Sequence, residues 1–264
     1  MTNPELDEKP SLGDDTPVVP APKSRYYLYG VVPVATDLTL GAIGLASGEV
    51  SLLRQGAVAA VVSRISGERI RPERRNLAAH AAVLKAFNDC TTVLPMSFGT
   101  ISASEQSIHD ILQRNQEVFV GQLKRVAGRL EMGLRVEWDV PNVFEFIVSH
   151  NPELAAERDE MLQGGQPNRD EMIRVGQQFE RTLNRERDRL FHRVEAVLLR
   201  HGAEVKRLAP RTEREVLNLA CLIARNQQDE FEAVVSEAAN GLDSNYLFNL
   251  SGPWAPHNFV AITL

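Results

Sequence analysis

The sequence predicts a mixed α/β (α+β) fold with two domains of similar size. Strand-like and helix-like segments alternate from residue 25 to the end of a 264-residue chain, which is long enough for two domains. The composition, 43% hydrophobic and 24% charged, is ordinary for a globular protein that buries a core. The segment Asp139–Asn142, which contains a proline, is the best internal boundary. We therefore expect an N-terminal domain at 25–140 and a C-terminal domain at 141–264.

Residues 1–24 are expected to form a disordered tail outside both domains. They hold five of the chain's 14 prolines and no aromatic residue. A segment of this composition cannot bury enough apolar surface to offset the entropy that it loses on ordering.

In the N-terminal domain, the spacing of apolar residues separates strands from a helix. Residues 25–32 (RYYLYGVV) have the composition of a strand, and 131–139 alternates between apolar and polar residues as a half-buried strand does. Residues 73–89 change to a helical period, with Leu77, Leu84 and Phe87 on one face. The other expected elements are strands at 49–54, 57–65 and 91–94 and a helix at 104–127, interrupted near Asn115. This mixture predicts a small sheet with helices packed on one side.

The C-terminal domain is expected to contain the longest helix, at residues 169–201. Its apolar stripe ends before Gly202, a residue type that commonly follows the last helical turn. Residues 215–224 have the composition of a strand but are also compatible with a helix. The remaining expected elements are strands at 143–149, 203–208 and 246–250 and helices at 152–163 and 227–240.

Charge and cysteine content restrict the class of partner and the compartment. The formal net charge of −6 argues against nucleic acid or an anionic membrane as a non-specific partner, because both require a basic surface. We expect no secretory leader, because no apolar h-region opens the sequence, and no apolar run reaches the roughly 18 residues that a membrane helix requires. Cys90 and Cys221 form no CxxC pair and are expected to be buried free thiols of a cytoplasmic protein.

The stretch 91–100 (TTVLPMSFGT) places Ser97 between a strand and a helix, as a hydrolase places its nucleophile. The nucleophile elbow requires G-x-S-x-G, and here Pro95 occupies the first glycine position. A serine nucleophile also needs a histidine base, and none of the downstream histidines lies in a sequence context that indicates a catalytic base. A turn at the end of a strand is the simpler interpretation of Ser97.

Other catalytic or ligand-binding patterns do not stand out. His80 lies on the apolar face of the 73–89 helix and is better explained as a partly buried, hydrogen-bonded histidine than as an acid, base or ligand. The six histidines show no HxxxH or HxH spacing for a metal, and no glycine-rich loop matches a phosphate or dinucleotide site. The residues alone thus give no positive case for an enzyme, a metal or a cofactor.

Four arginines form a ridge on the long helix at i, i+4 spacing: Arg181, Arg185, Arg189 and Arg193. The ridge could bind an acidic partner surface. Acidic residues are interspersed along the same helix, however, and mixed charge is usual on a solvated face. A solvated face is the simpler interpretation, and partner binding is kept as a hypothesis.

Four sequence blocks occur in an order that resembles a known family. They are Tyr27–Val32 (YLYGVV), Asn76–Leu84 (NLAAHAAVL), Thr92–Thr100 (TVLPMSFGT) and Ser251–Val260 (SGPWAPHNFV). Together they resemble the gas vesicle protein family called GvpF/GvpL, from about residue 26 to the end. This chain departs from the family's usual pattern by Ser97 in place of a basic residue and by Ala81 in place of an acidic one. It also has Ala255-Pro256-His257 where a second Pro-Pro and a tyrosine are common.

The resemblance implies a ferredoxin-like N-terminal domain, an α+β C-terminal domain and no enzymatic activity. It also implies a cytoplasmic accessory factor or minor component of gas vesicles, the hollow protein shells that give some prokaryotes buoyancy. The implied partners are the small hydrophobic major shell protein and other gas vesicle accessory proteins. The less favoured alternatives are a binding scaffold for another protein compartment and a serine hydrolase that uses Ser97.

Two hypotheses name the residues that would contact partners. The first is that the shell protein binds the N-terminal sheet, through its strands at Tyr26–Val32 and Glu131–Asp139 and the side chains of Tyr27, Tyr29 and Trp138. The second is that another accessory protein binds the arginine ridge. Both rest on strand content, charge spacing and the resemblance.

Overall fold

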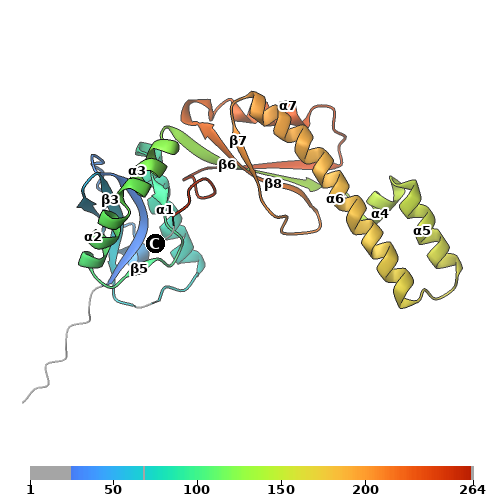
Figure 1. Ribbon diagram of the computed structural model, residues 1–264, viewed down its shortest axis with the longest axis horizontal. Helices are drawn as coiled ribbons and strands as arrows, with labels where there is room; N and C mark the ends of the chain where they lie inside the picture. The colour runs from blue at the N-terminus through green and yellow to red at the C-terminus, as the bar shows by residue number, and fades with distance from the viewer. Residues whose placement is uncertain (1–24, 68, 263–264) are drawn as a thin grey trace, which may run out of the picture.

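The computed structural model describes residues 25–67 and 69–262, so the tail expected at 1–24 lies outside the described residues. The molecule is elongated (Figure 1): an N-terminal body, a second sheet and a helical arm follow one another along its long axis. None of the described helices is long and apolar enough to cross a membrane.

The first sheet is antiparallel and has β1 near its centre. Its strands are β1 (Arg25–Pro33), β2 (Val50–Gln55), β3 (Val58–Ile65) and the two-residue strands β4 (Leu94–Pro95) and β5 (Ile101–Ser102). The order is β2-β3-β1-β4, and β5 also pairs with β1. Seven consecutive residues of β1 are buried, which explains why its sequence is a continuous apolar run and does not alternate.

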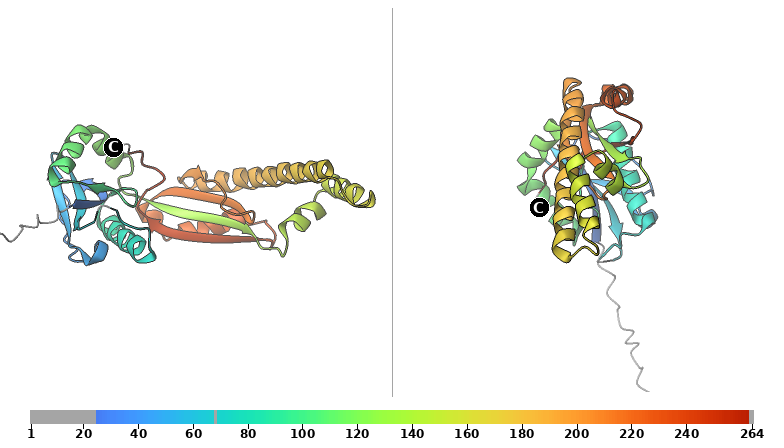
Figure 2. Two further views of the ribbon diagram at one scale, coloured as in Figure 1. Left: turned by 90° about the horizontal axis from the view of Figure 1, so that it is seen from below. Right: turned by 90° about the vertical axis from the view of Figure 1, so that its right-hand side faces the viewer.

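Helices cover both faces of this sheet, as Figure 2 shows. On one face, α1 (Arg74–Cys90) packs Val83 and Phe87 against Tyr27 and Tyr29. On the other face, α2 (Glu105–Arg114) and α3 (Gln116–Arg125) pack against Tyr26 and Leu28. The expectation of helices on one side is therefore wrong, whereas the interruption near Asn115 is confirmed.

The second sheet is also antiparallel, with the strand order β7-β8-β6-β9. Its strands are β6 (Arg129–Trp138), β7 (Glu204–Arg207), β8 (Glu215–Ala224) and β9 (Tyr246–Trp254). The expected strand at 131–139 exists as β6, but it pairs only with β8 and β9, so assigning it to the N-terminal sheet was wrong. Alternation indicates a half-buried strand, but it does not specify the sheet that the strand joins. A boundary at residue 140 separates β6 from its own sheet.

Residues 143–149 form a helix, α4 (Val143–Ser149), where a strand was expected. Asn142 caps this helix, because its side-chain oxygen accepts a hydrogen bond from the Glu145 N–H at 3.2 Å. The short β-branched and aromatic run resembled a strand, although Asn142 followed three residues later by Glu145 is a helix-start signal.

The arm consists of α4, α5 (Pro152–Gln163) and the far end of α6 (Arg169–Arg200). At 32 residues, α6 is about 48 Å long, at ~1.5 Å per residue. Asn168 and Glu171 form a capping box at its start, and Gly202 follows its end with φ of 77°. The other half of α6 packs on β7, β8 and α7 (Phe231–Ala239). The expected helices 169–201 and 227–240 are thus confirmed with slightly shorter limits.

Both sheets have the same strand order. Numbered along the chain within each unit, the strands lie in the order 2-3-1-4, which is the order of a ferredoxin-like sheet. In the first unit, a loop with the 3-10 turn η1 (Leu45–Ser47) stands where the second unit has α4, α5 and α6 between its first two strands. The fold class is confirmed, and the ferredoxin-like strand order extends to the C-terminal half.

The chain returns to the N-terminal body after β9. Ala255 joins the core on the α1 face of the first sheet, and Phe259 joins the core on the α2–α3 face. Ala220 and Leu222 of β8 lie in that same α2–α3 core. Residues 255–262, called the C-terminal strap below, therefore connect the two sheets.

Candidate functional site

Three of the four family blocks converge on one buried aromatic cluster. The Tyr27 hydroxyl lies 2.9 Å from His80 Nδ1 and accepts a hydrogen bond from the Gly99 N–H at 3.1 Å. The Tyr29 ring stacks on the His80 imidazole with centroids 5.7 Å apart, and Phe98 packs edge-on against it. The blocks that carry Tyr27, His80 and Phe98 are far apart in sequence, but they meet in one part of the hydrophobic core.

Burial keeps this cluster uncharged near neutral pH. It raises the pKa of Tyr27 to about 12 and lowers the pKa of His80 to about 4, with the charge of His257 as the second cause for His80. The Tyr29 hydroxyl bonds to Ser63 Oγ at 2.8 Å and accepts from the Leu45 N–H at 2.8 Å. The expectation of a buried, hydrogen-bonded His80 is confirmed.

Tyr27 and Tyr29 were expected to contact a partner, and this expectation is wrong for the described structure. Both side chains are fully buried. The expectation rested on strand content and the family resemblance, but β1 is covered by helices on both faces. The seven buried residues Tyr26–Val32 therefore offer no exposed side chain to a partner.

The fourth block contains the end of β9 and most of the C-terminal strap, which is fastened to β6. Glu131 is buried, and its carboxylate accepts hydrogen bonds from the Asn258 N–H at 2.8 Å and from Asn258 Nδ2 at 2.6 Å. Lys206 Nζ donates to the Asn258 carbonyl at 3.0 Å, and Arg125 donates to the Phe259 carbonyl. Burial raises the pKa of Glu131, while the bonds from Asn258 oppose that rise. The sequence analysis missed this pair, since the positions of Glu131 and Asn258 do not reveal that they meet.

Ser97 lies exposed in the turn between β4 and β5. Its carbonyl accepts from the Thr100 N–H and hydroxyl, and Gly99 has φ of 91°. Within the described residues, no histidine hydrogen-bonds to the Ser97 hydroxyl. The geometry is that of a turn at the end of a strand.

The two cysteines have different surroundings. Cys221 is buried in β8, where burial raises the pKa of its thiol to about 12. Cys90 is exposed at the end of α1, so the expectation that both thiols are buried is wrong for Cys90.

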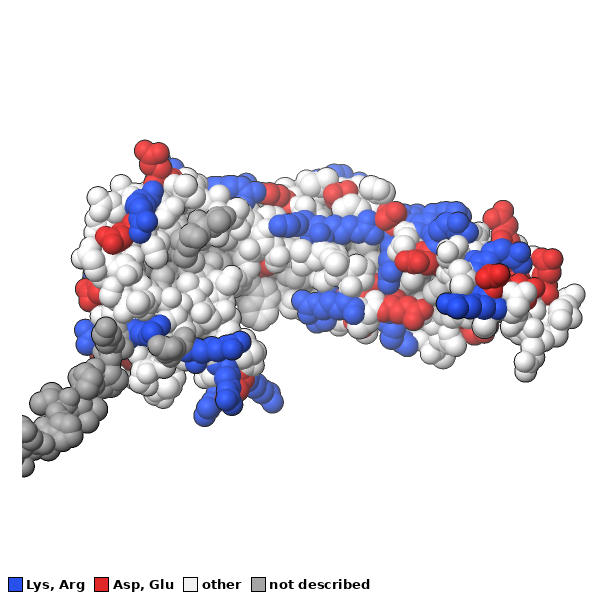
Figure 3. All heavy atoms as spheres, turned by 60° about the horizontal axis from the view of Figure 1, so that its bottom comes forward, with Lys and Arg blue, Asp and Glu red and all other residues white. Residues whose placement is uncertain are grey.

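The arginine ridge lies on the exposed side of α6, within a surface of mixed charge that Figure 3 shows along this part of the molecule. Arg181 bonds to Gln178 at 3.1 Å, Arg189 lies 3.8 Å from a Glu186 carboxylate oxygen, and Arg193 donates to the Asn240 carbonyl at 2.6 Å. Among the residues described, Arg185 has no ion pair. The ridge is accessible to a partner, in contrast to the tyrosines.

Trp138, the third aromatic candidate, is 1% exposed and is one of the residues that line a hollow at the base of the arm. This hollow, called the Trp138 hollow below, has a volume of about 250 Å³ and is bounded by α4, α6, β6 and β9. The structure brings Trp138 and Arg189 together there, with Thr182 and Tyr246. Trp138 therefore cannot lie on an exposed face of the N-terminal sheet, as was expected, because β6 belongs to the second sheet.

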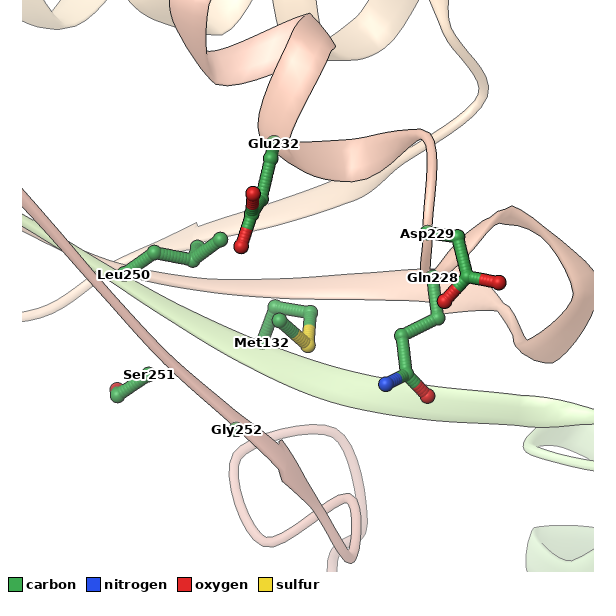
Figure 4. A pocket seen from close by; sticks show the side chains of 7 residues that line it. All are labelled: Met132, Gln228, Asp229, Glu232, Leu250, Ser251 and Gly252. Atoms are coloured by element: carbon green, nitrogen blue, oxygen red, sulfur yellow. The ribbon is translucent and has the colours of Figure 1, made fainter.

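A second hollow, of about 320 Å³, lies at the other end of β9 (Figure 4). Glu232 at the start of α7 and Gln228 in the segment before it point into this hollow, which Met132 of β6 also lines. In the part of the chain that the structure describes, no group of three His, Cys, Asp or Glu side chains could hold a metal ion.

The fold defines an α/β protein with two sheets of the same strand order, a helical arm and a C-terminal strap that joins the sheets. The chain belongs to the gas vesicle synthesis protein GvpL/GvpF family, whose model matches residues 25–261.

Relatives and a solved structure match over almost their full lengths. Gas vesicle protein F of Streptomyces sp. (strain CB03234) is 25% identical over 89% of this chain and 98% of the relative. Gas vesicle protein F of Microcystis aeruginosa (strain PCC 7806) is 28% identical with the same coverage. The crystal structure of the gas vesicle protein GvpF from Anabaena sp. PCC7120 superposes with a TM-score of 0.78 at 25% identity, covering 91% of this chain and 100% of that one.

Proposed function

We propose that this protein is a gas vesicle accessory or minor structural protein that is needed for vesicle assembly and acts in the cytoplasm, at the vesicle. The observation that carries the proposal is the extent of the family match, from residue 25 to residue 261. It includes both sheets, the arm and the strap. The role assigned is assembly and contact with other proteins, with no catalysis, no nucleic acid and no membrane insertion.

The partner we propose is the hydrophobic major shell protein. A subunit with a water-repelling face aggregates before assembly unless another protein covers that face. This chain exposes large apolar side chains on the arm and on the N-terminal body, among other positions. Near the tip of the arm they are Leu162, Met172 and Ile173; on the N-terminal body they include Leu77 of α1 and Val118 of α3, whose helices cover opposite faces of the first sheet.

Two sets of substitutions distinguish these surfaces. One variant carries Leu162→Gln, Met172→Gln and Ile173→Gln, and the other carries Leu77→Gln and Val118→Gln. Co-purification with the shell protein should be lost in one variant and retained in the other, because all five side chains are exposed and neither set should unfold the chain. Retention of shell protein by both variants would contradict an apolar contact at these places.

Deletion of the gene tests the assembly role directly. Electron microscopy of the deletion strain should show no vesicles or malformed ones, and the wild-type gene supplied on a plasmid should restore them. A Ser97→Ala gene should restore them equally well, because the hydroxyl has no catalytic role in this proposal. Normal vesicles in the deletion strain would refute a required role.

For the arginine ridge we propose contact with another gas vesicle accessory protein. The exposure of Arg185 and Arg189 supports this, since neither side chain is buried in the fold. Arg185→Glu with Arg189→Glu should weaken binding to an accessory protein, whereas Arg71→Glu with Arg74→Glu on the N-terminal body is the matched control. Equal binding by both double variants would remove the ridge from the proposal.

A further inference from the structure

We propose that a surface hollow of the N-terminal body binds this chain's own residues 14–22, an acidic and proline-containing segment. The hollow, called the Phe98 hollow below, has a volume of about 620 Å³. It lies where β1 begins, between the segment that precedes α1 and the turn between β4 and β5. Residues 14–22 lie outside the described residues and enter through their sequence alone. The proposal goes beyond the assembly role and does not depend on it.

The first observation is the apolar floor of the hollow. Ile70, Phe98 and Ile101 line it, and all three are half-buried side chains packed against the core on the α1 face of the first sheet. Pro72, which is exposed, completes the apolar part of the lining. Phe98 also packs edge-on against His80, so the floor is anchored to the buried aromatic cluster. Apolar grooves with aromatic side chains are surfaces on which proline-containing segments dock.

The second observation is the charge of the rim. Arg25 and Arg69 line the hollow, and none of its described lining residues is acidic. Arg69 is exposed and has no ion pair among the residues that the structure describes. The Trp138 hollow and the hollow of Figure 4 differ in this respect, because each is lined by two acidic residues. Guanidinium groups bind carboxylates through charge-assisted hydrogen bonds, so the rim selects an acidic segment.

The third observation is that the chain itself supplies a segment with both matching properties. Residues 14–22 read DDTPVVPAP, in which two adjacent aspartates precede a P-x-x-P pattern. The two lysines of residues 1–24 both fall outside this segment. Its prolines restrict the backbone before binding, so less conformational entropy is lost when the segment docks. The aspartates complement the arginine rim, and the P-x-x-P part complements the apolar floor.

The fourth observation is the position and length of the segment. It ends three positions before Arg25, which itself lines the hollow. An extended chain spans about 3.5 Å per residue, so the part from Asp15 to Arg25 reaches about 35 Å, enough to turn back onto a hollow that begins at Arg25. Tethering makes the binding intramolecular, at an effective concentration of about millimolar. A segment that buries too little apolar surface to fold by itself can bind here, because the hollow supplies that surface.

Paramagnetic relaxation in NMR spectra of the full chain tests the contact. Cys90→Ser removes the exposed cysteine, and Thr16→Cys then carries a nitroxide label, while Cys221 is buried and stays unlabelled. The label should broaden the backbone amide signals of Gly99 and Ile101, which line the hollow. The amide signals of the second sheet are the internal reference and should keep their widths.

Matched changes on both sides of the contact test its chemistry. Arg69→Glu, or Asp14→Lys with Asp15→Lys, should reduce the broadening at Gly99 about threefold, because each opposes like charges. All three substitutions together should restore part of it, and salt at about 0.5 M should weaken it by screening. Arg114→Glu is the control, since this exposed arginine lies on α2, which covers the opposite face of the first sheet. The amide spectrum of each variant shows directly that it is folded.

Several results would overturn the proposal. They are the absence of broadening at the hollow, broadening that Arg69→Glu leaves unchanged, and broadening spread evenly over the surface of the molecule. A mixture of nitroxide-labelled chains with isotope-labelled chains that lack the nitroxide detects contact between molecules. Broadening in that mixture would assign the segment to the hollow of a second copy and contradict binding within one chain. Vesicle formation is scored separately in the deletion strain, so failure here is distinguishable from failure of the assembly role.

Discussion

His80 makes the stability of the N-terminal body dependent on pH. It is 7% exposed, and its Nδ1 lies 2.9 Å from the Tyr27 hydroxyl. Burial lowers its pKa from 6.5 to about 4. In the unfolded chain the imidazole binds a proton below pH 6.5, whereas the folded protein resists protonation until about pH 4. The free energy of unfolding is therefore fully retained above pH 6.5 and falls as the pH drops from 6.5 toward 4.

The size of the effect follows from the same two pKa values. A tenfold difference in proton affinity is worth about 1.4 kcal/mol, so the full difference corresponds to about 3 kcal/mol. Between pH 7 and pH 4.5, most of it, roughly 2–3 kcal/mol, should be lost. This is a large part of the 5–15 kcal/mol that typically separates folded from unfolded protein.

Urea denaturation at pH 7 and pH 4.5, followed by circular dichroism, measures this loss in the wild type and in His80→Gln. The glutamine can still bond to Tyr27 but does not titrate, so the variant should lose less stability on acidification by the amount given above. Comparing the two proteins cancels the contributions of groups that do not interact with His80; His257, whose charge helps to lower the pKa of His80, is coupled to it. Equal losses would show that His80 is protonated as easily in the folded protein as in the unfolded chain, and would refute the reasoning.

Three further substitutions test the strap, a tight strand crossing and the Trp138 hollow. Asn258→Ala removes the side-chain hydrogen bond to the buried Glu131 carboxylate, while the backbone N–H bond remains, and should lower the free energy of unfolding by about 1.5–3 kcal/mol in urea titrations; an unchanged value would contradict a structural role for the strap. Gly30→Ala places a Cβ atom 2.7 Å from a backbone carbonyl of β4 and should destabilise the protein by about 1–3 kcal/mol. Gly121→Ala on α3 has open space and is the control, which should gain up to about 1 kcal/mol. Thr182→Val replaces an unpaired buried hydroxyl and should raise the free energy of unfolding by about 1–3 kcal/mol in the absence of a partner; a decrease would show that the hydroxyl is hydrogen-bonded, for example to water.

Local patterns predicted most elements of the fold correctly. The long helix α6 was recognisable because its apolar stripe extends over many turns and Gly202 follows it. The strands expected at 49–54 and 57–65 are β2 and β3, and Gly56 between them has the positive φ of 58° that their turn requires. Only α4 was assigned to the wrong type, because seven residues are too few for periodicity to outweigh a β-branched and aromatic composition.

Candidate contact residues were harder to predict, because exposure depends on the whole fold. The four arginines of the ridge (Arg181, Arg185, Arg189 and Arg193) lie on the surface, as charged residues usually do. Tyr27, Tyr29 and Trp138 are buried, since aromatic residues serve cores as well as interfaces, and their sequence positions do not distinguish the two. The outermost position of β9 in the second sheet was not predicted for a related reason: whether a strand is central or outermost depends on its pairing with distant segments.

The sequence by itself determined where most helices and strands begin and end, and it carried the four blocks that resemble the family. These features are local, because periodicity, caps, turn glycines and motifs are properties of neighbouring residues. Only the tertiary structure decided that β6 joins the second sheet, that three blocks meet around His80, and that Asn258 fastens the strap to Glu131. The same holds for the position of β9 at the outer edge of the second sheet. Each of these depends on contacts between residues far apart in the chain, which form only when both sheets are assembled.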